Sequence, residues 1–238
     1  MIREAMNKIV ELSQPVEFEF NGRKYTSKSI KPIHEPEPAP LVINTLTGLK
    51  DYFDTNPDDL DYERLLFQVV DAKTVLLIGP IFGQFDQRKC YLRTIHTGDA
   101  YPYDAFLDPE TFIIKLQAMF QQDETTARLL SIVGNIKDEK VTTVGDDGIT
   151  QQVTARAGIA RVENISLPNP ITLTPYRTFL EADQPSSQFV FRMRSGAAES
   201  PATCALFKAD GGRWKLKAMQ NIKKWLQENI ETPIQVLA

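Results

Sequence analysis

The stretch that decides the fold reads ISLPNPITLTPYRTFLEADQPSSQFVFRMRSG at residues 165–196, followed after a polar insert by CALFKADGGRW at residues 204–214. Alternation of apolar and polar residues with turn residues between the runs is typical of short antiparallel strands. It predicts strands at residues 161–167, 171–173, 188–194, 203–208 and 213–216. Asp210-Gly211-Gly212 predicts a hairpin turn between the last two strands.

The same stretch is dense in arginines and aromatic rings. Guanidinium groups bind phosphates and carboxylates in a fork geometry, and flat rings stack on bases. Arg192 and Arg194 are two positions apart, so they share one face of their strand, with Phe189, Phe191 and Met193 on the opposite, core side. The predicted ligand-binding residues are Tyr176, Arg177, Arg192, Arg194, Lys208, Arg213 and Trp214. The alternative is a charged sheet face that forms salt bridges with Glu181 or Asp183.

Upstream of this stretch, helical spacing predicts helices at residues 2–13, 45–56, 108–120 and 124–133. Strands are predicted at residues 16–20 and 23–27 around Asn21-Gly22, at 64–70, 74–78 and 89–96 as an antiparallel meander, and at 140–145 and 149–158. Residues 31–40, KPIHEPEPAP, predict an extended surface linker, or else a peptide ligand for a partner. A last helix is expected at residues 217–229.

These patterns predict an α+β fold that is rich in antiparallel sheet, with a meander, hairpins and helices packed on the sheets. We expect residues 1–40 to form an N-terminal helix, hairpin and proline-rich strap. Residues 41–138 would form an α/β meander half, and residues 139–238 a β-rich half closed by a C-terminal helix. The two halves could equally form one continuous domain.

Composition narrows the class of protein. With 238 residues, 42% hydrophobic and 24% charged, the chain resembles an ordinary globular protein rather than a disordered one. A net charge of −4 argues against non-specific binding to duplex DNA. Cys90 and Cys204 are expected to be buried free thiols, as suits a reducing cytoplasm. The absence of a signal peptide or an apolar run of roughly 20 residues predicts a cytoplasmic protein without membrane contact.

The sequence argues against most enzyme chemistry. It has two histidines, no phosphate-binding loop, no dinucleotide glycine pattern and no cluster of zinc ligands. Asp146-Asp147-Gly148 lacks the further ligands of a calcium loop, and solvated turn residues are the better interpretation. We therefore expect no enzymatic activity, no catalytic residue, no cofactor and no bound metal.

Four blocks resemble an uncharacterised family of bacteriophage and prophage proteins of the YfdQ-like kind. They are INTLTGLKDYF, LDPETFIIKLQAMF, PNPITLTPYRTFLEADQPSSQFVFR and CALFKADGGRWKLKAMQNIKKWL. The resemblance covers about residues 41–230 and implies a setting in the phage-infected host cell, but no chemistry and no site residues. By analogy with phage accessory proteins, it also suggests a homo-oligomer.

The expected function is a non-enzymatic phage accessory protein that binds a nucleotide-type anion, for example to sequester a host antiviral defence signal. One alternative is a protein that binds single-stranded nucleic acid or assists recombination, with stacking by Tyr176 and Trp214. Another is a structural role in protein–protein interaction.

Overall fold

The computed structural model describes residues 2–20, 23–26, 39–82, 87–137, 143–146, 151–157, 161–166, 169–194 and 202–238. The predicted turns at Asn21-Gly22 and Asp147-Gly148 and nearly all of the proline-rich strap lie outside the described residues. The chain divides into two compact units, Met1–Ala39 and Pro40–Ala238, which are described separately.

The fold is α+β, as the sequence predicts. Its helices are α1 (Ile2–Ser13), α2 (Leu46–Thr55), α3 (Pro109–Met119), α4 (Glu124–Lys137) and α5 (Arg213–Asn229), with a 3-10 turn at Tyr62–Arg64. Its strands are β1 (Glu17–Phe20), β2 (Arg23–Thr26), β3 (Leu41–Ile43), β4 (Leu66–Asp71), β5 (Thr74–Phe82), β6 (Gln87–Ile95), β7 (Thr143–Asp146), β8 (Gln151–Ala157), β9 (Arg161–Ser166), β10 (Ile171–Leu173), β11 (Ser187–Arg194), β12 (Thr203–Lys208) and β13 (Gln235–Leu237).

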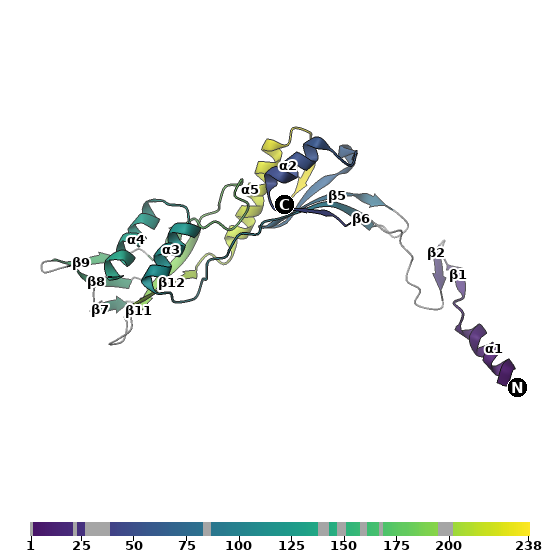
Figure 1. The fold of residues 1–238 in the computed structure, drawn as a ribbon, viewed down its shortest axis with the longest axis horizontal. Helices are drawn as coiled ribbons and strands as arrows, with labels where there is room; N and C mark the ends of the chain where they lie inside the picture. Colours follow the sequence, from purple (N-terminus) through teal and green to yellow (C-terminus); the bar gives the residue numbers. More distant parts are fainter. Residues whose placement is uncertain are drawn as a thin grey trace. The chain divides into compact units, whose positions relative to one another are not determined.

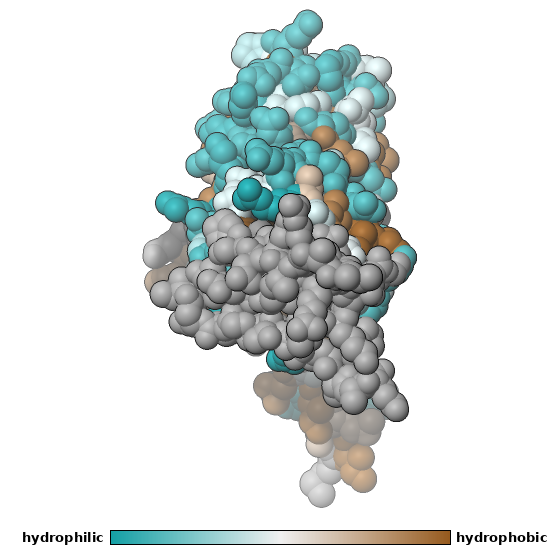
Figure 2. All heavy atoms as spheres, turned by 90° about the vertical axis from the view of Figure 1, so that its left-hand side faces the viewer, coloured by the Kyte–Doolittle hydropathy of each residue, from teal (hydrophilic) through white to brown (hydrophobic). Residues whose placement is uncertain are grey.

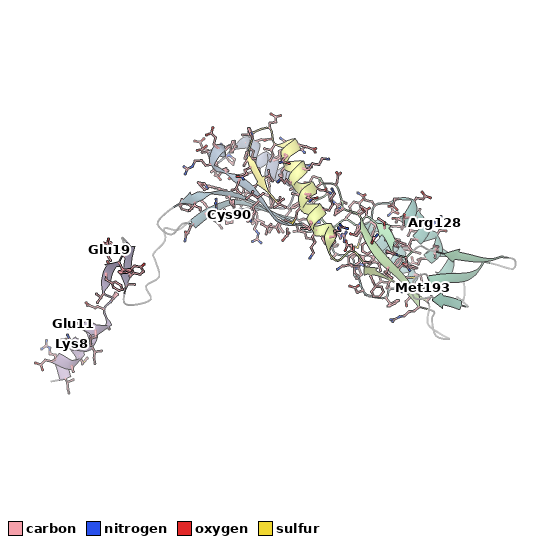
Figure 3. All side chains as sticks on the ribbon, turned by 180° about the vertical axis from the view of Figure 1, so that it is seen from behind. Lys8, Glu11, Glu19, Cys90, Arg128 and Met193 are labelled. Atoms are coloured by element: carbon pink, nitrogen blue, oxygen red, sulfur yellow. The ribbon has the colours of Figure 1, made fainter. Side chains whose placement is uncertain are left out.

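The N-terminal unit contains α1 and the antiparallel pair β1–β2, which confirms the predicted helix and both strands. Its described side chains are mostly exposed, including the apolar groups of α1. Lys8 and Glu11 lie side by side on α1, with 2.9 Å between Nζ and Oε2 (Figure 3). Among the described residues of this unit, the apolar stripe of α1 therefore buries no side chain.

The first core of the second unit is built on the sheet β13-β4-β5-β6-β3. The central meander is antiparallel, as predicted, whereas β3 and β13 add short parallel edges that the sequence patterns did not indicate. Helices α2 and α5 lie over this sheet (Figure 1). Thr45 caps α2 by accepting a hydrogen bond from the Gly48 N–H at 3.0 Å. The helix buries Leu49 and Phe53 in the core that it shares with the sheet.

The second core lies between the antiparallel sheet β10-β11-β12 and helices α3 and α4 (Figure 1). Burial alternates along β11, and Phe189, Phe191 and Met193 face the core as predicted. Asp108 caps α3 through the Thr111 N–H at 2.9 Å, and Phe112 and Leu116 are buried. The further sheet β7-β8-β9 is antiparallel, which confirms the strands predicted there.

One predicted strand is wrong. Residues 213–216, expected to return from a hairpin at Asp210-Gly211-Gly212, form the first turn of α5 instead. Gly212 takes a left-handed conformation, with φ +82°, and its N–H donates to the Asp210 carboxylate at 3.0 Å. This turn therefore directs the chain into a helix, whose buried residues Ala218, Ile222 and Leu226 follow helical spacing.

Both cores draw residues from either side of position 138. The first combines parts of residues 46–92 with parts of 179–236, and the second combines parts of 101–133 with parts of 171–206.

On the face in Figure 2 the coloured residues are mostly hydrophilic. Among the helices of the described ranges, none combines the length and the hydropathy that crossing a bilayer requires.

Candidate functional site

Arg177 is the charged residue around which the candidate site is built. It follows β10, and only 8% of its surface is exposed. Its guanidinium carbon lies 4.0 Å from the ring centre of Trp214 and 5.8 Å from that of Phe189. These cation–π contacts hold the guanidinium between a residue of α5 and a residue of β11.

One side of the guanidinium is anchored by hydrogen bonds. Nη2 donates to the Ser187 hydroxyl and to the Pro185 carbonyl, the latter at 3.4 Å. Ser187 in turn donates to the Asp210 carboxylate at 2.7 Å. Although burial opposes the effect, the bonds from Ser187 and Gly212 and the charge of Arg177 lower the pKa of Asp210. Asp210 is therefore a half-buried counter-charge that reaches Arg177 through Ser187.

On its other side the guanidinium lies beside the Tyr103 hydroxyl, and a poorly aligned hydrogen bond between the two groups favours the charged form of Arg177. Apart from this contact, Nε and Nη1 of Arg177 and the hydroxyls of Tyr101 and Tyr103 are buried without a well-aligned hydrogen-bond partner among the described residues. Burial lowers the pKa of Arg177, whereas the neighbouring Tyr103 and Asp210 favour its charged form. Burial raises the pKa of Tyr103 to about 12 and that of Tyr101 as well, so both hydroxyls keep their protons at neutral pH.

These groups belong to residues that line one cavity of about 360 Å³. Five segments meet there: the β4–β5 turn, the segment after β6, the segment after β10, the end of β12 and the first turn of α5. The charged and aromatic residues of its wall are Lys73, Asp99, Tyr101, Tyr103, Asp104, Arg177, Lys208 and Trp214. The Lys208 ammonium lies 4.8 Å from the ring centre of Tyr103. We call this space the Arg177 cavity.

The Arg177 cavity brings together Arg177, Lys208 and Trp214, three of the predicted ligand-binding residues. Arg213 lies at a second cavity of about 680 Å³, which Trp214 also lines. Tyr176, 40% exposed, lies at a third of about 620 Å³ with His96 and Leu180. None of these cavities has Arg192 or Arg194 in its wall.

Those two arginines lie on the other face of β11. Arg194 stacks on Phe106, with 3.7 Å between its guanidinium carbon and the ring centre. Arg192 is opposite Ala205 of β12, and its Nη1 is buried without a partner among the described residues. Glu181, which the sequence suggested as an ion-pair partner, accepts a hydrogen bond from the Thr47 N–H at 3.2 Å.

Sequence reasoning missed Lys73, Asp99, Tyr101, Tyr103 and Asp104. Lys73 lies in a short turn, and the others lie in a segment without helical or strand periodicity. The cluster Tyr101-Pro102-Tyr103-Asp104 is the one pattern that could have pointed to them, because rigid aromatic segments in loops are common at binding sites.

The thiols and carboxylates of the described residues suggest no metal site. No group of three or more His, Cys, Asp or Glu side chains in that part of the chain is placed to hold a metal ion. Cys204 is buried, as predicted, but Cys90 on β6 is only half-buried, contrary to expectation (Figure 3). Burial raises the pKa of both thiols.

No family model, no curated protein and no solved structure matches the chain.

Proposed function

We propose that this chain is a non-enzymatic binding protein and that its Arg177 cavity takes a nucleotide-type anion. One observation carries the proposal: Nε and Nη1 of Arg177 and the hydroxyls of Tyr101 and Tyr103 are buried without a well-aligned hydrogen-bond partner among the described residues, and all three residues line a single cavity. All four can donate a hydrogen bond at neutral pH, and the two hydroxyl oxygens can also accept one.

Buried donors without partners are costly, at about 1–3 kcal/mol each. A ligand that offers several acceptor oxygens would remove this cost at once. A guanidinium prefers the oxygens of a phosphate or carboxylate, to which its hydrogen bonds are charge-assisted. The cavity is therefore suited to an anionic group rather than to a neutral one.

The shape and lining support the nucleotide part of the proposal. A volume of about 360 Å³ lies within the range of small-molecule sites, roughly 300–1,000 Å³. Trp214, Tyr101 and Tyr103 provide aromatic surface next to the cations. Aromatic surface beside positive charge is a common recognition pattern for bases attached to phosphates.

We propose that the cavity binds its ligand without catalysing a reaction, because its tyrosine hydroxyls are poorly suited to act as a general acid or base. A general acid or base works best when its pKa lies near the working pH. With a pKa of about 12, the Tyr103 hydroxyl stays protonated. Arg177 is held between two rings and anchored by Ser187, so its charge is fixed in place.

The biological role that we propose is that of an accessory protein of a bacteriophage, acting in the host cell. It rests on the resemblance of residues 41–230 to YfdQ-like phage and prophage proteins. A cavity that binds a nucleotide without converting it would suit the capture of a nucleotide-type defence signal.

Binding of single-stranded nucleic acid is a second candidate. It is favoured by the cavity of about 680 Å³, where Arg213 and Lys217 of α5 lie beside Trp214. Tyr176, however, lines a different cavity, which weakens the idea of joint stacking by Tyr176 and Trp214. This candidate predicts an affinity for oligonucleotides that falls steeply with salt, measurable by fluorescence anisotropy.

The test of the first candidate is isothermal titration of the full chain with cyclic AMP, a cyclic adenosine dinucleotide, ATP and ADP-ribose. Binding of at least one of these is expected. Arg177→Lys should weaken it by about tenfold or more, because buried charge-assisted hydrogen bonds are lost. Lys208→Ala, at an exposed position, should weaken it by about threefold.

Arg194→Ala is the matched control, since Arg194 also stacks on an aromatic ring but lies outside the cavity. It should leave the affinity within about twofold of the wild type. Absence of binding to every ligand, or equal effects of Lys208→Ala and Arg194→Ala, would rule the proposal out.

A further inference from the structure

We infer that the Arg177 cavity selects a nucleotide whose phosphate is a diester with one negative charge, over phosphate monoesters and polyphosphates. This inference rests on the proposed function and specifies its ligand class. It follows from the balance of charge in the cavity wall and from the way its acidic side is held.

The charges of the wall leave a small positive surplus. Three cations, Lys73, Arg177 and Lys208, and two carboxylates, Asp99 and Asp104, line the cavity, so the lining itself, without Asp210 outside it, carries one positive charge. Tyr103 adds none, because its pKa is about 12. One anionic group balances this wall, and each further negative charge would be repelled by the carboxylates.

The positive charge of Arg177 is already partly compensated by a carboxylate within the protein. Asp210 attracts the guanidinium from behind Ser187, to which it is joined by a hydrogen bond of 2.7 Å. A ligand therefore competes with an internal counter-charge for the same cation. Cavities that bind triphosphates need several uncompensated cations or a metal ion, and this arrangement offers less.

The acidic side of the wall is fixed to the sheet. The Asp104 N–H donates to the Leu206 carbonyl of β12 at 3.0 Å, and Leu107 and Cys204 exchange two hydrogen bonds of 2.8 Å. Asp104 has a left-handed backbone, with φ +62°. These bonds fix the backbone of Asp104 beside β12, so its carboxylate stays near the cavity although its side chain is exposed.

The same carboxylates can serve the ligand as acceptors. An ionised aspartate accepts hydrogen bonds from hydroxyl and amino groups and donates none. A ligand with a ribose hydroxyl or a base amino group near its phosphodiester would satisfy Asp99 or Asp104 while its phosphate satisfies Arg177 and the tyrosines. The ligand class is therefore a phosphodiester nucleotide with a free hydroxyl or amino group, as found in cyclic mononucleotides and cyclic dinucleotides.

The test compares ligands of one base and one sugar that differ in charge: cyclic AMP, AMP, ADP and ATP, titrated calorimetrically at constant ionic strength without divalent metal. The same series is repeated with guanosine and uridine. At pH 7.5 the phosphate of AMP carries nearly two charges, because its second pKa is about 6. We expect the cyclic ligand to bind tightest, with a loss of about fivefold for each added charge.

The double variant Asp99→Asn with Asp104→Asn removes two negative charges from the wall. It should reduce the differences in affinity between these ligands or reverse their order. Asp59→Asn is the matched control, because Asp59 is also exposed and left-handed, with φ +51°, but lies outside the cavity. Asparagine tolerates this backbone region, so the substitutions should not impair folding.

An affinity that rises with ligand charge, together with an unchanged ranking in the double variant, would overturn the inference but leave nucleotide binding intact. Absence of binding in all three series would overturn the proposed function and this inference with it. If Asp59→Asn changes the order of the ligand affinities as much as the double variant does, the carboxylates act through long-range charge and not through the cavity. That result would also overturn the inference.

Discussion

Ser187 links the buried charge of Arg177 to the half-buried charge of Asp210. Its hydroxyl accepts a hydrogen bond from Arg177 and donates one to Asp210, and only 5% of its surface is exposed. Ser187→Ala would leave both charged groups without this partner, so we expect it to lower the free energy of unfolding by about 1–3 kcal/mol. Urea denaturation measures the change.

The neighbouring Ser186 provides the control for this prediction, because its side chain is exposed. Ser186→Ala should change the stability by less than about 0.5 kcal/mol. Equal stability of the two variants would contradict the role of Ser187 as a link between Arg177 and Asp210.

His96 makes the stability of the fold depend on pH. Burial lowers its pKa below the ordinary value of 6.5, and Lys73 acts in the same direction, whereas Glu181 opposes them. Between its folded pKa and 6.5, the unfolded chain binds a proton at this residue that the folded chain does not. The free energy of unfolding should therefore fall as the pH drops below 6.5.

Thermal unfolding of the wild type and of His96→Gln between pH 7.5 and 5 measures this effect. The wild type should lose more stability than the variant as the pH falls. The other histidine, His34, is present in both proteins, so its contribution cancels in the comparison. Parallel curves for the two proteins would contradict the prediction.

At the scale of the elements, the start of α5 decides where Trp214 lies. Gly212 precedes the helix with φ +82°, a region in which an L-residue with a Cβ is strained. We expect Gly212→Ala to destabilise the protein by about 1 kcal/mol. Chemical denaturation followed by circular dichroism measures the change.

Gly134 in α4 is the matched control, since an added Cβ meets nothing within 4 Å there. In this helical position Gly134→Ala should raise stability, by up to about 1 kcal/mol. A stabilising Gly212→Ala would show that the chain does not enter α5 as described.

The elements also show how far the sequence could predict this fold. Long periodic segments such as α3, the central meander and β11 followed from apolar spacing and from caps such as Asp108. The strands β3 and β13 are too short to carry a period, and tertiary contacts with β6 and β4 decide them. Asp210-Gly211-Gly212 fits the entry to a helix as well as a hairpin, so local chemistry alone could not place Arg213 and Trp214.

The candidate site was less predictable than the fold. Residue type pointed to Arg177, Lys208 and Trp214, which meet at one cavity, but it could not separate them from Arg192 and Arg194 on the other sheet face. Arg177 is buried because its guanidinium packs between Trp214 of α5 and Phe189 of β11. Neither residue is its neighbour in sequence. No local pattern contains this information.

At the scale of the whole molecule, the N-terminal unit carries a testable expectation of self-association. Ile2, Met6 and Ile9 of α1 are 80%, 61% and 66% exposed, and a helix of about 12 residues is barely stable alone in water. We propose that a second copy of the chain covers this stripe, which makes the protein a homo-oligomer.

Light scattering after size-exclusion chromatography tests this proposal on the full chain. The wild type should elute as an oligomer, and the double variant Met6→Glu with Ile9→Glu should shift to smaller species. Lys8→Ala, on the same helix, is the control and should keep the oligomer. A monomeric wild type would contradict the proposal.

We propose that the anion binds at Nε of Arg177, a buried N–H without a well-aligned hydrogen-bond acceptor among the described residues. The most direct measurement is a proton–nitrogen correlation spectrum of arginine Nε–H groups in the full chain, recorded during titration with cyclic AMP. One resonance, absent from the spectrum of Arg177→Lys, should move downfield and exchange more slowly with water as the ligand binds. If that resonance stays unchanged while the ligand saturates the protein, the ligand binds elsewhere and the account is wrong.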